Sequence, residues 1–279
     1  MARQKPIVAI SGSTGFVGKN LRRFLAEQDI PVIALSRKKH KHFKSEKRIV
    51  FSDIDNVPKL QCNAMIHLIG TGAQTKDSDY ELVNVKQTDK IIRLCKRSNI
   101  KKIVYISGLG VNDHTKFGYF ISKLKAEHLI IESGLDYTIL RASYIVGADD
   151  PLTQNLSKQA KQGIVQIPGS GSYRLQPILI NDVCKIILNC VINKKLSNQI
   201  VDLVGPSTIS FENYVKKFIR GKKTKIKKIP LEQAYFVALN NPKKTSYGID
   251  DLNIMVGDFT SSHKKLERLS GIKLEKPIL

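Results

Sequence analysis

The chain has 279 residues, 42% of them apolar, and its 46 lysines and arginines against 24 acidic residues give a formal charge of +22. This length and apolar content suffice for a large domain with a smaller lobe, which excludes disorder for the bulk of the chain. No apolar run reaches the roughly 20 residues of a membrane span, and the first residues contain no signal-peptide pattern. We therefore expect a cytoplasmic location, with peripheral membrane contact left open. The four cysteines form no CxxC pair, which favours reduced, mostly buried thiols and indicates no metal site.

Short apolar segments alternate with amphipathic ones through the first half of the chain. The pattern predicts strands at 7–10, 32–35, 48–51, 64–68, 103–106 and 137–140. Between them it predicts helices at 19–27, 80–98 and 117–133. This rhythm is typical of βαβ units and predicts an α/β fold with a doubly wound parallel sheet of the Rossmann type.

The alternation loosens after about residue 148. Residues 168–172 predict a turn or exposed loop, and a last helix is predicted over 181–191 with Asn181 or Asp182 as its N-cap. The neighbouring Asp149 and Asp150 are expected to be solvated on a turn. We expect a dinucleotide-binding core at 1–148 and a smaller α+β substrate lobe at 149–279, with segments around 174–204 returning to the core.

A glycine-rich turn lies directly between the first predicted strand and the first predicted helix. Gly12, Gly15 and Gly18 follow the spacing GxxGxxG. Such a turn lets the backbone approach a pyrophosphate, whose charge then faces the amides at the start of the helix. The sequence therefore predicts a dinucleotide-binding turn, which consists of Gly12, Thr14, Gly15, Phe16, Val17 and Gly18.

The end of the second predicted strand indicates which dinucleotide binds. NAD selection needs a carboxylate there for the ribose hydroxyl, but the chain continues with Ser36, Arg37 and Lys38. An arginine can pair with a 2′-phosphate through two hydrogen bonds, so we expect NADP rather than NAD. The alternative is that this first basic segment (37–48), with seven basic residues and one acid, is only a solvated loop.

A second constellation lies at the fifth predicted strand and the helix that follows it. Ser107 is at the carboxyl end of the strand, and Tyr119 and Lys123 are spaced i, i+4 on the helix. A nearby ammonium and the positive nicotinamide ring would favour the phenolate of Tyr119, while Ser107 could hydrogen-bond the same substrate oxygen. These three are the candidate catalytic residues. His67, inside an apolar strand, is expected to be a hydrogen-bonded core histidine instead.

These motifs resemble the short-chain dehydrogenase/reductase superfamily, in its extended and atypical branches. The similarity covers roughly residues 5–210 and includes the glycine turn, Val83-Asn84-Val85, Ser107, the segment from Tyr119 to Lys123, and residues 140–147. It implies that Tyr119 exchanges the proton and Ser107 orients the reacting oxygen. It also assigns further cofactor contacts: Asp53 and Ile54 at the adenine, Ile69 and Gly70 at the adenosine ribose, Lys123 at the nicotinamide ribose, and Ala142 and Ile145 along the nicotinamide.

The short interval between Ser107 and Tyr119 differs from that of sugar-nucleotide epimerases in this superfamily. It favours the atypical branch, which includes NAD(P)-dependent reductases and the nucleotide-binding accessory subunit of respiratory complex I. We therefore expect NADPH-dependent hydride transfer on a small carbonyl or alcohol substrate. The alternative is an accessory or assembly factor that binds NADPH without catalysis.

A second basic segment (216–228) contains eight basic residues and no acid. It could contact an acidic protein or an anionic membrane surface, or it could simply be solvated. Phe218 is the single aromatic residue among its cations, so a stacking surface for single-stranded nucleic acid is absent. Association with nucleic-acid phosphates is the weakest of these alternatives.

Overall fold

The computed structural model describes residues 5–72, 74, 79–241 and 247–277. Its main sheet has seven parallel strands in the order β3-β2-β1-β4-β5-β6-β11. The strands are β1 (Val8–Ser11), β2 (Val32–Ser36), β3 (Glu46–Val50), β4 (Ala64–His67), β5 (Lys102–Gly108), β6 (Asp136–Ala142) and β11 (Gln199–Leu203). This order confirms the predicted Rossmann-type sheet, in which the winding reverses between β1 and β4.

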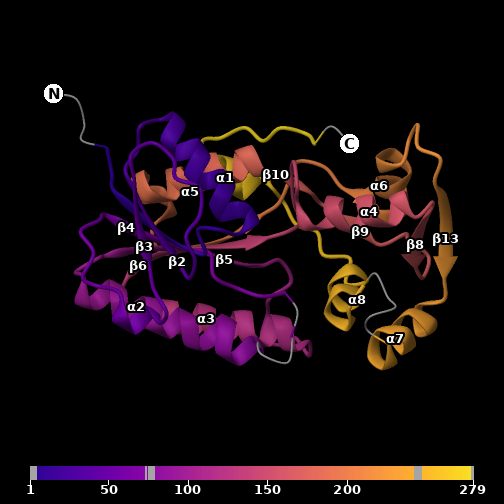
Figure 1. Ribbon diagram of the computed structural model, residues 1–279, viewed down its shortest axis with the longest axis horizontal. Coiled ribbons are helices and arrows are strands. Elements are labelled where there is room, and N and C mark those ends of the chain that lie inside the picture. The colour runs from indigo at the N-terminus through magenta and orange to yellow at the C-terminus, as the bar shows by residue number, and fades with distance from the viewer. Residues whose placement is uncertain (1–4, 73, 75–78, 242–246, 278–279) are drawn as a thin grey trace.

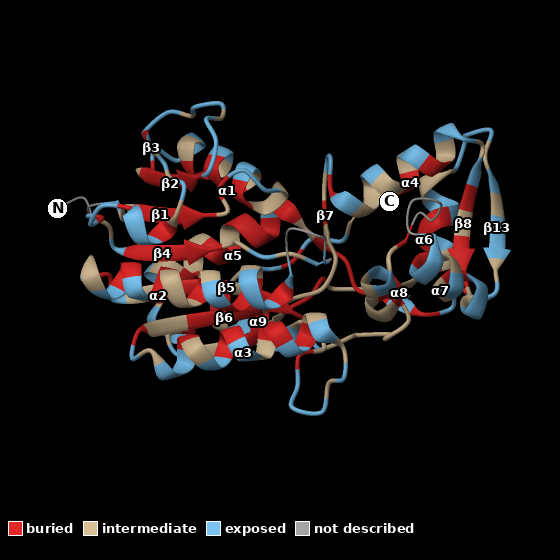
Figure 2. Cartoon of the chain, turned by 60° about the horizontal axis from the view of Figure 1, so that its bottom comes forward, coloured by how far each residue is buried: buried red, intermediate tan, exposed pale blue. Residues whose placement is uncertain are grey.

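Helices cover both faces of this sheet (Figure 1). On one face lie α1 (Phe16–Glu27), α5 (Ile180–Ile192) and α9 (Lys264–Ser270), and on the other lie α2 (Gln87–Arg97) and α3 (Gly118–Glu132). Each face buries its own apolar cluster, so the inner strands β1, β2, β4 and β5 are buried along most of their length (Figure 2). A π-helical turn (Glu81–Lys86) precedes α2, and short 3₁₀ turns occupy Ile54–Asn56 and Lys194–Leu196.

The remaining elements form a C-terminal lobe with its own apolar cluster. It consists of α4 (Pro151–Lys161), β8 (Ile164–Pro168), α6 (Phe211–Phe218), β13 (Lys225–Ile229), α7 (Leu231–Asn240) and α8 (Ile249–Met255). In this lobe β8 and β13 form a parallel pair. Two further pairs form: β7 (Ile145–Val146) with β10 (Ile178–Leu179), which joins the lobe to the sheet domain, and β9 (Arg174–Leu175) with β12 (Ile209–Ser210), which lies in the lobe.

The chain crosses between these two regions more often than the sequence suggested. Besides α5 and β11, the segment around α9 also packs on the sheet domain, where Leu266 and Leu274 join the α1/α5 cluster. The backbone amide of Glu275 donates to the buried Asp182 carboxylate at 2.8 Å. Residues 149–279 are therefore split between the lobe and the sheet domain.

Two expectations for the second half of the chain are wrong. The helix predicted over 181–191 is α5, but α6, α7, α8 and α9 follow it, and its N-cap is Leu179 without a side-chain bond. Asp182 instead accepts from Lys185 and Glu275. Asp150 is 1% exposed rather than solvated, because its carboxylate caps α4 through the amide and hydroxyl of Thr153. The four later helices have only seven to ten residues each, too short to show a full periodic pattern, which explains the first error.

Candidate active site

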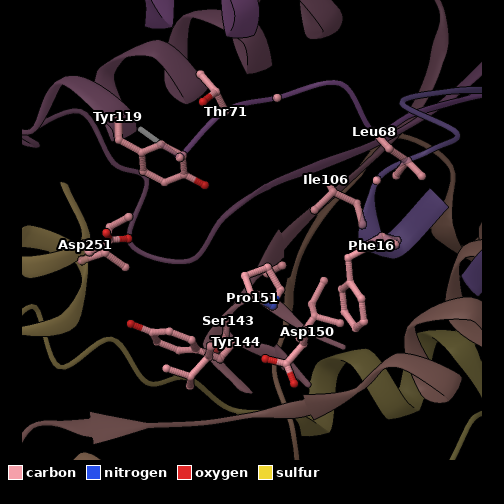
Figure 3. A pocket seen from close by; sticks show the side chains of 18 of the residues that line it. Phe16, Leu68, Thr71, Ile106, Tyr119, Ser143, Tyr144, Asp150, Pro151 and Asp251 are labelled. Carbon is pink, nitrogen blue, oxygen red and sulfur yellow. The ribbon is translucent and has the colours of Figure 1, made fainter. Parts of the chain in front are cut away.

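A cavity of about 530 Å³ opens at the carboxyl ends of the sheet strands, where the C-terminal lobe faces the sheet domain. Ligands bind at this edge in open parallel sheets, beside the point where the winding reverses. Figure 3 shows Tyr119 and Tyr144 projecting into the cavity and Phe16 closing the end near the glycine turn. Eleven of the predicted site residues line it: Gly12, Gly15, Phe16, Val17, Gly18, Gly70, Ser107, Tyr119, Lys123, Ala142 and Ile145.

The glycine turn is shaped by close backbone approaches. Gly12 has a φ of +69°, and a Cβ atom there would stand 2.7 Å from the backbone of Leu68 at the end of β4. At Gly18, a Cβ would lie 2.3 Å from the carbonyl oxygen of Gly12. Ser13 ties the turn to β2 by donating its hydroxyl to the Leu35 carbonyl at 2.7 Å. The turn therefore presents bare backbone at the start of α1, and we call it the glycine cradle. A pyrophosphate site requires such a backbone without side chains in the way.

Ser107 and Tyr119 lie next to one another on the cavity wall. The Ser107 hydroxyl is buried and has no hydrogen-bond partner among the described residues. Tyr119 packs on the next residue of β5, since a Cβ on Gly108 would stand 3.2 Å from the Tyr119 oxygen. A buried hydroxyl without a partner is costly unless a ligand supplies one. The glycine cradle and this hydroxyl thus fit a dinucleotide and a substrate oxygen in one cavity.

The Lys123 ammonium forms hydrogen bonds with groups other than Tyr119. Its Nζ donates to the Tyr105 hydroxyl at 3.2 Å and to the Ile106 carbonyl at 3.1 Å. Burial lowers the pKa of Lys123 to about 8. Burial also raises the pKa of Tyr119 to about 12 rather than lowering it, because desolvation disfavours the phenolate. Lys123 still lines the cavity, and its Nζ would be 3.0 Å from a Cβ on Gly70.

A buried hydrogen-bonded chain lies behind these side chains. The imidazole of His67 is 2.7 Å from the Ser11 hydroxyl and 2.9 Å from the Thr88 hydroxyl, which donates to the Asn84 carbonyl. Because the Thr88 hydroxyl donates its proton to Asn84, it can only accept from His67. The imidazole therefore donates from Nε2 to Thr88 and accepts at Nδ1 from Ser11. Burial lowers the pKa of His67 to about 3. The expectation of a satisfied core histidine is confirmed.

Asn84, on the π-helical turn, connects the cavity edge to the start of α3. Its amide donates to the Ser122 hydroxyl at 2.9 Å and accepts from the Thr71 backbone amide at 2.9 Å. The Ser122 hydroxyl in turn donates to the Tyr119 carbonyl at 2.7 Å. Asn84 thus fixes the start of α3 and the loop after β4 relative to each other, a role that the motif around it did not reveal.

The residues predicted to select NADP lie outside the enclosed cavity. Ser36 is buried at the end of β2 and donates its hydroxyl to the Lys38 carbonyl at 2.8 Å. Arg37 and Lys38 are exposed just beyond it, and Thr14 is exposed on the glycine turn. The bond from Ser13 to Leu35 brings this surface next to the cradle.

Of the residues assigned to the adenine and its ribose, Gly70 lines the cavity, whereas Asp53, Ile54 and Ile69 lie outside it. The Asp53 carboxylate accepts from Lys90 at 2.7 Å and caps a 3₁₀ turn. The Ile54 side chain is 1% exposed in the α2/α3 cluster, and Ile69 packs against the same cluster. An adenine at this edge would meet the backbone of Ile54 rather than its side chain.

Sequence reasoning missed the part of the cavity that the C-terminal lobe supplies. Tyr144 belongs to the motif at 140–147 and could have been noticed there. The others lie far apart in the sequence and meet only in the folded chain. They are Asp150, Pro151, Leu152, Asn155, Tyr247, Asp251, Ile254 and Met255.

The second basic segment spans the end of α6 and all of β13, at the edge of the lobe away from the sheet (Figure 1). Glu212 accepts from Lys228 at 2.7 Å and pairs with Lys216 at 2.8 Å, so an acid outside the segment neutralises part of its charge. The ammonium of Lys222 lies 3.6 Å from the centre of the Phe218 ring. The lysines at 217, 223, 225 and 227 are exposed.

A family model described as NAD(P)H-binding matches residues 12–166. The chain is 22% identical over 228 residues to the mitochondrial NADH dehydrogenase (ubiquinone) 1 alpha subcomplex subunit 9 of Dictyostelium discoideum, which covers 77% of this chain and 64% of that protein. It is 25% identical to a 2-alkyl-3-oxoalkanoate reductase of Stenotrophomonas maltophilia, over 63% and 62% of the two chains. The chain spans between 49% and 64% of the length of the mitochondrial complex I relatives it matches.

Among solved structures, the epimerase Mth375 of Methanothermobacter thermautotrophicus superposes with a TM-score of 0.78 at 14% identity. The match covers 99% of this chain and 90% of that one. At this identity the similarity shows the fold. In the described part of the chain, no helix has both the length and the apolar character needed to cross a bilayer.

Proposed function

The chain belongs to the NAD(P)H-binding family, and from this membership we propose that it binds NADP and reduces a carbonyl substrate through Ser107, Tyr119 and Lys123. The observation that supports this most is the buried Ser107 hydroxyl, which has no hydrogen-bond partner in the described part of the chain. It lies beside the Tyr119 phenol in the cavity that also contains the glycine cradle. A substrate oxygen placed there would accept hydrogen bonds from both hydroxyl groups.

The high pKa of Tyr119 suits the reductive direction. When bound, NADPH supplies the hydride that reduces a carbonyl carbon. The carbonyl oxygen then needs a proton, and Tyr119 retains its own throughout the neutral range because its pKa is about 12. Ser107 orients the same oxygen by hydrogen bonding. General acid catalysis of this kind contributes about 100- to 10,000-fold to a rate.

Lys123 has a different proposed role, in holding the cofactor ribose and returning a proton to the site. Its ammonium is already fixed by Tyr105 and the Ile106 carbonyl at the cavity floor. With a pKa of about 8, it loses its proton in mildly alkaline solution. If its charge is needed, the reduction rate falls as the pH rises through about 8.

The preference for NADP is proposed from charge at the end of β2. Arg37 and Lys38 are exposed beside the glycine turn, and Ser36 occupies the position where NAD selection would need a carboxylate. A 2′-phosphate at this edge would pair with the guanidinium of Arg37.

The test is NADPH oxidation with a panel of ketones and aldehydes. We expect Tyr119→Phe to lower turnover by at least about 100-fold while NADPH still binds. Tyr137→Phe is the matched control, since Tyr137 lies at the amino end of β6, whereas the cavity lies at the carboxyl ends of the strands. A Tyr119→Phe protein that reduces the panel at the wild-type rate would refute the catalytic assignment.

A second proposal is that the protein holds NADPH without turnover and docks through its second basic segment to an acidic protein or an anionic membrane. The similarity to a complex I subunit and the exposed lysines of β13 favour it. The two proposals differ in one result. Tight NADPH binding with no Tyr119-dependent turnover on any carbonyl of the panel supports the accessory role.

A further inference from the structure

A smaller cavity of about 140 Å³ adjoins the active-site cavity on the far side of Tyr119. The two share a wall made of Tyr119, residues 142–144 and Ile254. The rest of the smaller cavity, here called the side pocket, is lined by Gly108, Leu109, Phe120, Phe259 and Arg174. A group attached to the carbonyl carbon of a substrate at Tyr119 would therefore lie next to the side pocket.

Aromatic rings form the walls of the side pocket. Phe120 makes edge-to-face contacts with Tyr119 and with Phe259, both at 5.1 Å between ring centres. Leu109 and Phe120 are themselves buried, at 9% and 1% exposure. Such rings favour another apolar or aromatic group in an offset or edge-to-face arrangement.

Two glycines from distant parts of the chain make room for Phe259. A Cβ on Gly110 would lie 2.7 Å from this ring, and one on Gly257 would lie 2.1 Å from it. Gly110 follows β5, whereas Gly257 follows α8. The ring is therefore seated between the sheet domain and the lobe, which defines the shape of the side pocket.

The one charged lining residue is engaged at the rim. Arg174 donates to the Asp258 carboxylate through Nε at 3.0 Å and Nη2 at 2.9 Å. This pair neutralises the guanidinium and leaves the apolar rings as the main features facing the interior. The side pocket is thus poorly suited to a phosphate or a second charged group.

We propose that the side pocket receives an apolar substituent about the size of a phenyl ring, so that the substrate is a hydrophobic ketone or aldehyde. The volume supports this size, because a protein cavity of about 150 Å³ lined by leucine, isoleucine and phenylalanine stays dry and binds benzene. This proposal rests on the reductase function, in that the substrate carbonyl lies at Tyr119. The side pocket itself can be tested without turnover.

The binding test uses fluorobenzene, followed by ¹⁹F NMR in the presence of NADPH. We expect saturable binding to the wild type and its loss in Leu109→Phe, which fills the side pocket. Leu82→Phe, on an exposed site of the π-helical turn, is the matched control. Ile254→Phe fills the side pocket from the lobe side and serves if Leu109→Phe does not fold. Binding that persists in a folded side-pocket variant, or no binding to the wild type, overturns the proposal.

The turnover test compares 4-phenyl-2-butanone with levulinate, a ketone of similar length that ends in a carboxylate. We expect kcat/KM to favour the phenyl ketone by about 100-fold or more. The reason is that burying a phenyl ring in an apolar pocket is favourable, whereas burying a carboxylate there is costly. Preference for levulinate would assign the side pocket to Arg174 and overturn the apolar substrate. Fluorobenzene binding that Leu109→Phe abolishes, without turnover of any ketone, supports the side pocket and refutes the reductase function.

Discussion

The sheet domain and the C-terminal lobe line one cavity, but they contribute different kinds of residue. The sheet domain supplies backbone and proton-handling groups: the glycine cradle, Ser107, Tyr119 and Lys123. The lobe contributes mainly apolar and neutral surface, such as Leu152, Ile254 and Met255. In the proposed function, this division assigns the cofactor chemistry to the parallel sheet and the choice of substrate to the smaller core.

The two basic segments differ in a similar way. The single acid of the first basic segment, Glu46, is buried and pairs with Arg22 at 2.8 Å, which fixes the end of this loop. Arg22 also donates to the Lys41 and Ser13 carbonyls, so the loop is tied to the glycine turn. In the second segment the lysines point outward from an edge strand. A charged segment that is fixed beside a cavity suits a small anion, whereas an exposed one suits an extended surface.

The largest expected effect concerns the pH dependence of stability in the sheet domain. The pKa of His67 is about 3 in the folded chain and 6.5 in the unfolded chain, so only the unfolded chain binds this proton between those values. The free energy of unfolding should therefore fall as the pH drops from about 6.5 to 3, by on the order of 4 kcal/mol from this group.

Urea unfolding between pH 7 and pH 4 checks this linkage. His67→Gln can keep a donor and an acceptor in the buried chain but cannot take up the proton, so its stability should fall less steeply with acid. His128→Gln, on the exposed side of α3, should follow the wild type. Equal slopes in all three proteins would show that His67 does not titrate on unfolding.

The next effect tests the glycine cradle against a glycine of the lobe. Gly18→Val would drive a side chain into the Gly12 carbonyl, and we expect NADPH affinity to fall roughly 100-fold, or about 3 kcal/mol. Gly248→Ala, at the start of α8, has only ordinary contacts and should leave the affinity unchanged. Fluorescence titration with NADPH measures both. Unchanged affinity in a folded Gly18→Val protein would remove the cradle from the cofactor site.

A smaller effect concerns cofactor choice. Arg37→Ala should weaken NADPH binding by about tenfold and leave NADH binding nearly unchanged, because only NADPH carries the 2′-phosphate. Arg220→Ala, in the second basic segment, is the control. The assignment of Arg37 fails if the wild type binds both cofactors equally, or if Arg37→Ala weakens them alike.

The smallest effect tests the exposed lysines of the lobe. Lys223→Ala should weaken binding to vesicles that contain anionic lipid by about 1 kcal/mol, which is what each basic residue near such a surface contributes. The difference should shrink as salt is added. NADPH affinity is the internal control and should not change. Vesicle binding that is the same in the variant would exclude a membrane role for the second basic segment.

The parts of the site in the sheet domain could be predicted from the sequence, whereas those that depend on the lobe could not. The turn at Gly12 and Gly18 and the pair Tyr119 and Lys123 are local patterns, so their placement in one cavity followed from the predicted parallel sheet. The side pocket depends on Phe259 meeting Gly110 across about 150 residues, which no local pattern encodes. Burial raises the pKa of Tyr119 in the folded chain, and the helix spacing gave no information on this desolvation.

The central claim is that the cavity transfers hydride rather than only holding a cofactor. The most direct measurement is a single-turnover reaction with NADPH deuterated at the transferred position, followed by mass spectrometry of the alcohol. We predict that the wild type places one deuterium on the carbinol carbon of the product and that Tyr119→Phe forms little of it. NADPH that binds tightly while no ketone of the series takes up deuterium would contradict the claim.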